Sequence, residues 1–121
     1  MVPNINATEY FYEDMTKDSA ASAQSLLKPH AAAAFTFSKV TVAGWRFVPS
    51  TYVYTKNDKA FAVNLQEFLA RRAQQEGGKD SDVNPFSGPL GEVYIDVSHC
   101  ALAMDRAEEF SNVIRSIAES V

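Results

Sequence analysis

The sequence predicts one α/β unit of strand, helix, strand, helix order, and three observations support this. The chain has 121 residues, 46% hydrophobic and 21% charged, which suits one globular unit and is too small for two full domains. Two runs rich in β-branched and aromatic residues, 50–55 and 92–97, predict strands. Apolar residues recur at helical spacing between these runs and again after them. Such an order predicts two parallel strands with a right-handed crossover.

The first third of the chain is expected to hold an entry segment and short helices. Residues 1–15 carry aromatic side chains without a clear period, which predicts an extended segment. Thr16 or Asp18 is suited to cap a helix that runs through Leu27. Pro29 closes this helix, because the residue before a proline resists helical backbone angles. The alanine-rich stretch that Pro29 opens predicts a second short helix.

The first strand is expected to lead into an amphipathic helix. Residues 50–55 end at a turn-forming stretch, 56–59. The helical pattern after this turn continues up to Gly77-Gly78, a pair typical of a helix end. One side of the helix carries Phe61, Leu65, Phe68, Leu69 and Arg72.

The second strand is expected to lead into the last helix. It follows a long loop, 79–91, that is rich in Asp, Gly and Pro. The spacing Asp105-x-x-Glu108 resembles a capping box at the start of a helix. The side chains expected to point inward from this helix are Phe110, Val113, Ile114, Ile117 and Val121.

Composition argues against several functional classes. The formal charge of -4 and the scattered Lys and Arg leave no basic stripe, so nucleic acid is not an expected partner. The longest apolar run, 31–35, is far shorter than the ~20 residues that span a bilayer. One cysteine, Cys100, and no visible secretory signal predict a reducing, cytoplasmic setting. Two histidines and one cysteine far apart do not make a ligand set, so neither a metal nor another cofactor is expected.

Asp58 and His99 follow the two predicted strands in turn. The loops that leave parallel strands emerge at the same edge of the sheet, and adjacent strands lie ~4.8 Å apart. A carboxylate and an imidazole in these loops can therefore form a hydrogen bond if the strands are neighbours, as an orienting acid and a general base do. Ligands also bind at this edge in open α/β sheets. Taken singly, Asp58 is also explained as a turn or capping residue and His99 as an exposed loop histidine.

Three parts of the sequence resemble a known family. They are FYED at 11–14 with LKPH at 27–30 and AAF at 33–35, WRFVPSTYV at 45–53 with NDKA at 57–60, and DVSH at 96–99 with DRAEE at 105–109. These parts resemble, in turn, the late cap segment, the strand and turn of the acid, and the strand and loop of the histidine in α/β-hydrolases of the methyl-esterase and hydroxynitrile-lyase-like branch. The resemblance implies that residues 1–47 are the end of a cap and residues 48–121 the carboxy-terminal part of the hydrolase core.

The same resemblance implies a Ser-His-Asp triad in which Asp58 is the acid and His99 the base. The expected chemistry is hydrolysis of an ester, lactone or thioester of a small organic molecule. In this family the serine precedes both residues in a G-x-S-x-G elbow, and the sequence contains no such motif. We therefore expect the isolated chain to have no appreciable esterase activity. The start at Met1, just before the cap segment, is that expected of a shortened gene product or an incomplete gene model.

The expected absence of the amino-terminal half of the hydrolase core affects which partners are expected. Two alternatives to the triad also stay open. A two-stranded parallel piece exposes a strand edge, which predicts a partly ordered monomer, self-association, or complementation by a chain that carries the amino-terminal half. A small-molecule substrate is expected only in the completed protein. One alternative is a non-catalytic truncated remnant or interaction module. The other is a cysteine enzyme with Cys100 as nucleophile, which the divergence of adjacent side chains disfavours.

Overall fold

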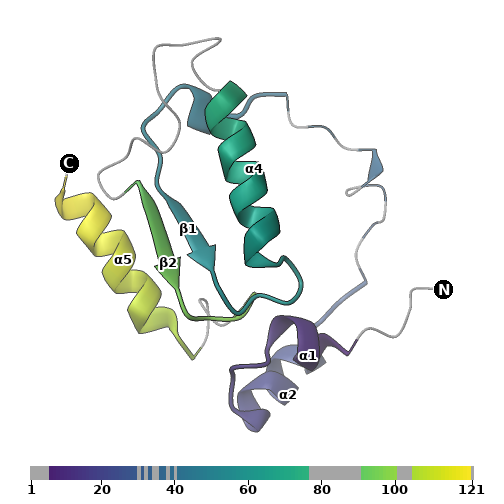
Figure 1. Ribbon diagram of the computed structural model, residues 1–121. Helices are drawn as coiled ribbons and strands as arrows, with labels where there is room; N and C mark the ends of the chain where they lie inside the picture. The colour runs from purple at the N-terminus through teal and green to yellow at the C-terminus, as the bar shows by residue number, and fades with distance from the viewer. Residues whose placement is uncertain are drawn as a thin grey trace.

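The structure, a computed structural model, describes residues 6–29, 31, 33, 36–37, 39, 41–76, 91–100 and 105–120. Its described elements, in chain order, are α1 (Ala7–Phe11), α2 (Lys17–Ser25), a 3-10 turn (Gly44–Arg46), β1 (Tyr52–Thr55), α4 (Val63–Glu76), β2 (Glu92–Ile95) and α5 (Ala107–Glu119) (Figure 1). The predicted mixed α/β class is confirmed. Among these helices, none is long and apolar enough to cross a bilayer.

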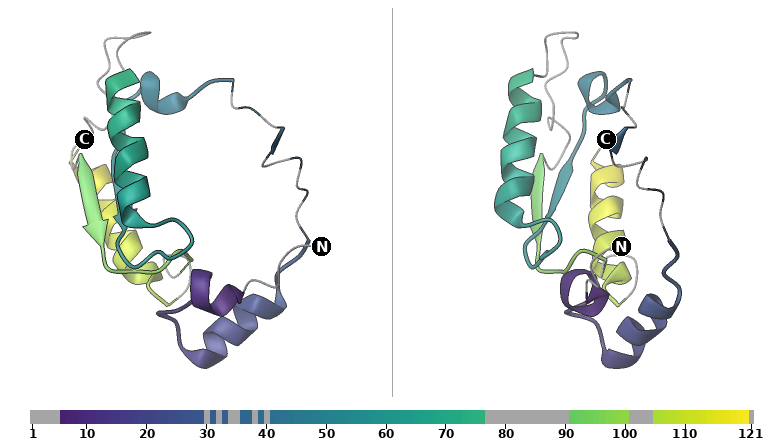
Figure 2. Two further views of the ribbon diagram at one scale, coloured as in Figure 1. Left: turned by 45° about the vertical axis from the view of Figure 1, so that its right-hand side comes forward. Right: turned by 90° about the vertical axis from the view of Figure 1, so that its right-hand side faces the viewer.

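β1 and β2 are neighbours and run parallel, as the sequence predicts. The sheet lies between α4 and α5 (Figure 2). Tyr54 pairs in register with Tyr94, and their rings stack with centroids 4.4 Å apart. The Tyr94 hydroxyl donates to Glu67 of α4 over 3.1 Å, so this face of the sheet is the one that α4 covers. Alternating residues of the strands therefore face the core on the other side.

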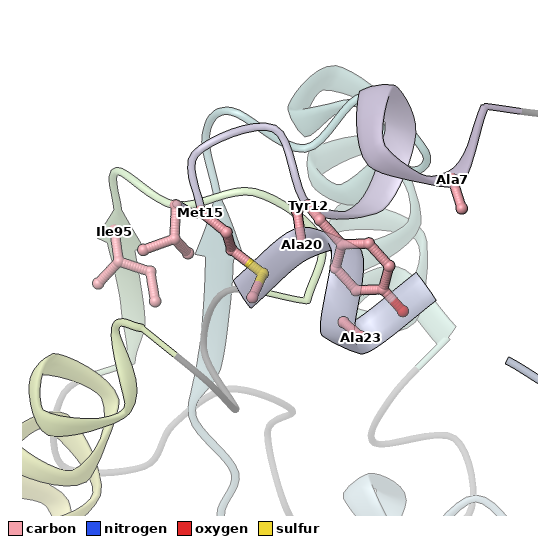
Figure 3. Packing of buried hydrophobic residues seen from close by; sticks show 7 residues of the cluster. Ala7, Tyr12, Met15, Ala20, Ala23 and Ile95 are labelled. Atoms are coloured by element: carbon pink, nitrogen blue, oxygen red, sulfur yellow. The ribbon is translucent and has the colours of Figure 1, made fainter. Parts of the chain in front are cut away.

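The core lies where the carboxyl end of β2 meets the first two helices (Figure 3). Its buried members are Ala7, Tyr12, Met15, Ala20, Ala23, Ile95 and Val97. Three of them are alanines, which let the helix backbones come close to their neighbours. Val53, Val93 and Val113 pack against this cluster, so both strands and α5 share it with α1 and α2. The core is thus placed at the sheet edge from which the two site loops leave.

The amino-terminal expectations are met in part. An extended segment over 1–15 is wrong for the described part, because residues 7–11 form α1 and bury Ala7 against the core. Thr16 caps α2 as expected, since its side chain accepts from the Ser19 amide over 3.2 Å. The helix ends at Ser25, before Leu27. The second helix expected from Pro29 lies largely outside the described residues.

The strand expectations hold in place but not in length, because the strands cover 52–55 and 92–95. The long loop 79–91 and the glycine pair at 77–78 lie outside the described residues, Gly91 excepted. Gly91 has φ 59°, a left-handed backbone angle that suits glycine, directly before β2.

The expected helix after β1 is present, but its buried side is not the apolar one. Gln66 and Ala70 are the buried residues of α4, whereas Leu65 and Leu69 are exposed and Phe68 is 58% exposed. The reason is local, because the Gln66 amide bonds to the end of β1 and so sets the rotation of the helix. We call Leu65, Phe68 and Leu69 the outer apolar face of α4.

The capping box expected at the last helix is wrong. The Asp105 carboxylate accepts from the Thr16 amide over 3.0 Å, and Arg106 occupies the cap position of α5, where its side chain makes no capping bond and pairs instead with Glu109. Of the residues expected inward, Val113 packs against the core, whereas Ile114 is exposed. Val121 lies outside the described residues. The Asp105 carboxylate, which the sequence predicts as a local cap, instead links the start of the last helix to the start of α2.

Replacing Val97 tests where the core lies. Val97 is fully buried, so Val97→Ala removes packed methyl groups and leaves a cavity. We expect the free energy of unfolding in urea to fall by about 2 kcal/mol. The matched control Val42→Ala changes a residue that is 65% exposed and should alter it by less than about 0.5 kcal/mol. Equal effects of the two substitutions would contradict this core.

Candidate acid–base site

The loops after β1 and β2 bring Asp58 and His99 together. Beyond the strands the two backbones stay paired, since the Lys56 amide donates to the Ile95 carbonyl over 2.9 Å. The Asn57 amide likewise donates to the Val97 carbonyl over 3.2 Å. The loops therefore run together at one edge of the sheet (Figure 1). His99 Nδ1 lies 2.8 Å from Asp58 Oδ2, which is the contact that the strand order predicts.

Asp58 is buried, with a side chain only 4% exposed, yet its carboxylate is well supplied with donors. The Phe61 amide donates to Oδ1 over 2.7 Å, and the Thr55 hydroxyl donates to Oδ2 over 3.0 Å. His99 supplies the third bond. A buried carboxylate is costly unless hydrogen bonds satisfy it, and here three donors do so. Asp58 is thus a turn residue and a partner of His99 at the same time.

Gln66 fixes Thr55, whose hydroxyl orients Asp58. Its side chain is buried in α4, and its Oε1 accepts from the Thr55 amide over 3.1 Å. Its Nε2 donates to the Thr55 carbonyl over 3.1 Å, to the Thr55 hydroxyl over 2.9 Å and to the Phe61 carbonyl over 2.6 Å. Because the Thr55 hydroxyl accepts from Gln66, its own proton is directed to Asp58. A chain of hydrogen bonds then runs from Gln66 through Thr55 and Asp58 to His99.

His99 presents its other ring nitrogen away from Asp58. A carboxylate only accepts, so Nδ1 carries the proton in the neutral ring and Nε2 keeps a free lone pair. The His99 side chain is 39% exposed, and one side of its ring packs against Phe11, with centroids 5.3 Å apart. This arrangement of buried acid and accessible imidazole can take a proton from a group placed at Nε2.

The backbone on both sides of His99 is tied to residues 11–14. The Ser98 amide donates to Asp14 Oδ2 over 2.6 Å, and the Ser98 hydroxyl contacts Asp14 Oδ1. The Cys100 amide donates to the Phe11 carbonyl over 3.0 Å. The histidine loop is therefore placed by a segment from the amino-terminal part of the chain.

Three residues of the site were not identified from the sequence. Thr55 and Gln66 lie on elements that the sequence predicts. The apolar stripe beside Gln66, however, predicts that the other side of the helix is buried. Asp14 is 84 residues away from Ser98, and no local spacing links the two. The burial of Gln66 in an amphipathic helix indicates its role, but this burial is visible only in the structure.

Cys100 is a poor candidate for a nucleophile. Burial, followed by the nearby negative charge of Asp58, raises the pKa of the thiol above its usual value. The thiolate is the reactive form, so a raised pKa lowers reactivity at neutral pH. The structure thus adds a second argument to the divergence of adjacent side chains.

Other features of the described residues do not add to the site. No cluster of three or more potential metal ligands occurs in the part of the chain that the structure describes. One surface hollow is lined by residues of α4, including Phe68 and Arg72, and another by residues near the start of α5, including Asp105. Neither hollow is lined by Asp58 or His99.

Removing the Gln66 amide should destabilise the chain. Gln66→Leu leaves the Thr55 amide and the Thr55 and Phe61 carbonyls without this partner, and unpaired buried groups cost about 1–3 kcal/mol each. We expect the free energy of unfolding to fall by roughly 3 kcal/mol. Gln75→Leu, at an exposed position of the same helix, is the matched control and should change it little. A similar loss in both variants would contradict the role of the Gln66 amide.

The environment of Cys100 should show in its alkylation rate. Because the pKa of Cys100 is raised, less thiolate is present at pH 7.5. Iodoacetamide should therefore react more slowly with Cys100 than with the thiol of glutathione. Asp58→Asn removes the charge but not the burial, so the pH midpoint of alkylation should fall and the rate should rise. Measured rate–pH profiles of both proteins check this. A rate equal to that of glutathione in the unsubstituted chain would contradict it.

The site described here rests on its own geometry. Comparisons of this chain with protein-family models, curated proteins and solved structures found no match. What these residues can do follows from their distances, burial and hydrogen-bond direction. The strongest feature in those terms is the contact between a buried carboxylate and a partly exposed imidazole.

Proposed function

We propose that Asp58 and His99 are the acid and base of a Ser-His-Asp hydrolytic site that acts on an ester, lactone or thioester of a small organic molecule. One observation carries this proposal. The Asp58 carboxylate lies 2.8 Å from His99 Nδ1, at the sheet edge to which the carboxyl ends of two parallel strands point. The imidazole is thereby held in the tautomer that leaves Nε2 able to accept a proton.

The two residues would share the proton chemistry of acyl transfer. His99 Nε2 takes the proton of an attacking hydroxyl and later returns it to the leaving group. Asp58 holds the imidazole in this orientation and stabilises the positive charge that forms on it. The bonds from Thr55 and Phe61 keep the carboxylate fixed through this cycle, because they engage both of its oxygens.

The attacking serine would come from outside these 121 residues. The sequence has no G-x-S-x-G elbow, and backbone donors for an oxyanion would also have to be supplied. On this proposal residues 48–121 are the carboxy-terminal part of an α/β-hydrolase core, and residues 1–47 are the end of its cap. The place of α1 beside the histidine loop is consistent with a cap segment that closes over the base.

A non-catalytic interaction module is the second candidate. The observation that favours it is the outer apolar face of α4, where three large apolar side chains are exposed on one helix. A face of this kind is usually covered by another segment or another protein. This candidate requires no proton transfer, so the two functions differ in whether His99 affects the reactivity of a serine.

The proposal is tested by labelling the native protein with a fluorophosphonate, which reacts with serines that a general base activates. The protein is isolated from its source cells, unsubstituted or carrying chromosomal His99→Gln or Asp58→Asn. We expect a labelled serine in the unsubstituted protein or its complex and a labelling rate at least about 100-fold lower in both variants. The label is located by mass spectrometry.

Two further arms separate the candidates. Cys100→Ser is the control for nonspecific effects near the base and should retain the labelling rate. The purified 121-residue chain should neither take up the label nor hydrolyse p-nitrophenyl acetate in a His99-dependent manner. Absence of a labelled serine in the native protein, or labelling that does not depend on His99, would favour the interaction module. His99-dependent turnover by the chain alone would contradict the need for an outside serine.

A further inference from the structure

Residues 11–14, which we call the clamp segment, contact both loops of the site. On the base side, the amides of Ser98 and Cys100, the two neighbours of His99, donate to acceptors in this segment. On the acid side, Glu13 forms an ion pair with Lys59, the neighbour of Asp58. The clamp segment therefore bridges two loops that come from different strands.

The contacts of the clamp segment differ in strength. Lys59 is more than half exposed, and an exposed ion pair contributes little. Ser98, in contrast, is fully buried, so its amide and hydroxyl need partners within the protein. Both Asp14 oxygens engage Ser98, and bonds to a charged acceptor are the stronger kind. Asp14 is thus the residue of the clamp segment whose side chain holds the base loop, beside the bonds to the Phe11 carbonyl.

The ring of His99 depends on this backbone placement. Its Nδ1 must lie within hydrogen-bond reach of an Asp58 carboxylate that is fixed by its own bonds to Thr55 and Phe61. Because the acid is fixed, the distance between the two is set by where the backbone of the base loop lies. Phe11 adds a second restraint by packing against the ring. A shift of the loop by an ångström would break the 2.8 Å contact.

We propose that Asp14 is a positioning residue for His99, acting through Ser98 to keep Nδ1 on Asp58. The importance of this for catalysis rests on the function proposed above, whereas the positioning itself does not. A role in folding alone would make Asp14 matter for stability but leave the His99 ring unchanged in the folded protein. The two roles are therefore separable by observing the ring.

The test is nitrogen-15 NMR of the His99 ring in the full 121-residue chain. In the unsubstituted protein we expect the tautomer with hydrogen on Nδ1 and slow exchange of that hydrogen with water. Asp14→Ala should raise the exchange rate about tenfold and mix the tautomers, because the Ser98 amide loses its acceptor and the Ser98 hydroxyl keeps only the Phe11 carbonyl. Asp14→Asn should restore most of the original spectrum, since its amide oxygen can accept from the Ser98 amide and its NH₂ can donate to the Ser98 hydroxyl.

Control variants make each outcome decisive. Asp18→Ala removes an exposed carboxylate in the first turn of α2 and should leave the ring signals as they are. Ser98→Ala removes only the hydroxyl and keeps the bond from the residue 98 amide to Asp14, so it should raise the exchange rate by a smaller factor. If Asp14→Ala does not fold, Ser98→Ala is the variant that tests the proposal. Ring signals that are unchanged in folded Asp14→Ala, or in Ser98→Ala if Asp14→Ala does not fold, would overturn the proposal.

The same variants separate this proposal from the proposed function. Fluorophosphonate labelling of the native protein with Asp14→Ala should be slowed together with the change in the ring. If the native protein shows no His99-dependent labelling at all, the proposed function fails. The positioning role then stands or falls by the NMR spectra alone.

Discussion

The structure depends on satisfying one buried charge. Asp58 is placed almost out of contact with water at the end of β1, where a carboxylate is stable only if donors surround it. The donors come from the turn itself, from the strand and from the second loop, as Phe61, Thr55 and His99. The parallel pairing of β1 and β2 is what makes the third donor available. The same interaction therefore stabilises the turn and orients the imidazole.

This requirement has a consequence for α4. The Thr55 hydroxyl is directed at Asp58 because Gln66 occupies its other side, and Gln66 does so only if the helix turns its polar residue inward. Rotation of the helix to bury Leu65 and Phe68 would gain apolar burial but would leave the end of β1 without its partners. Burying these two side chains would be worth about 3–6 kcal/mol, whereas the four buried groups that would lose Gln66 cost about 1–3 kcal/mol each. The polar contacts prevail, and the outer apolar face of α4 remains exposed.

How much the sequence predicts depends on how far apart the interacting residues are. The strands, the parallel order, the Thr16 cap and the approach of Asp58 to His99 follow from local patterns and from the topology they imply. The capping box fails because Asp105 has a competing partner in Thr16, which lies 89 residues away. The α1 helix, too, gains its stability from packing rather than from its own sequence, since short helices are marginal alone. The resemblance to α/β-hydrolases remains a prediction, because no finding tests it.

The site is assembled from three distant parts of the chain, and this decides which part controls the base. The carboxylate of the acid is fixed by bonds within residues 55–66, and the amino-terminal segment reaches the acid loop through the exposed Glu13–Lys59 ion pair, which contributes little. Among the described residues, the base loop is held by a distant segment, because the amides that flank His99 are bound by Phe11 and Asp14. A motion of residues 7–14 would therefore displace His99 more than Asp58. If residues 7–14 belong to a cap that moves when substrate binds, the ability of His99 to accept a proton would depend on the position of the cap.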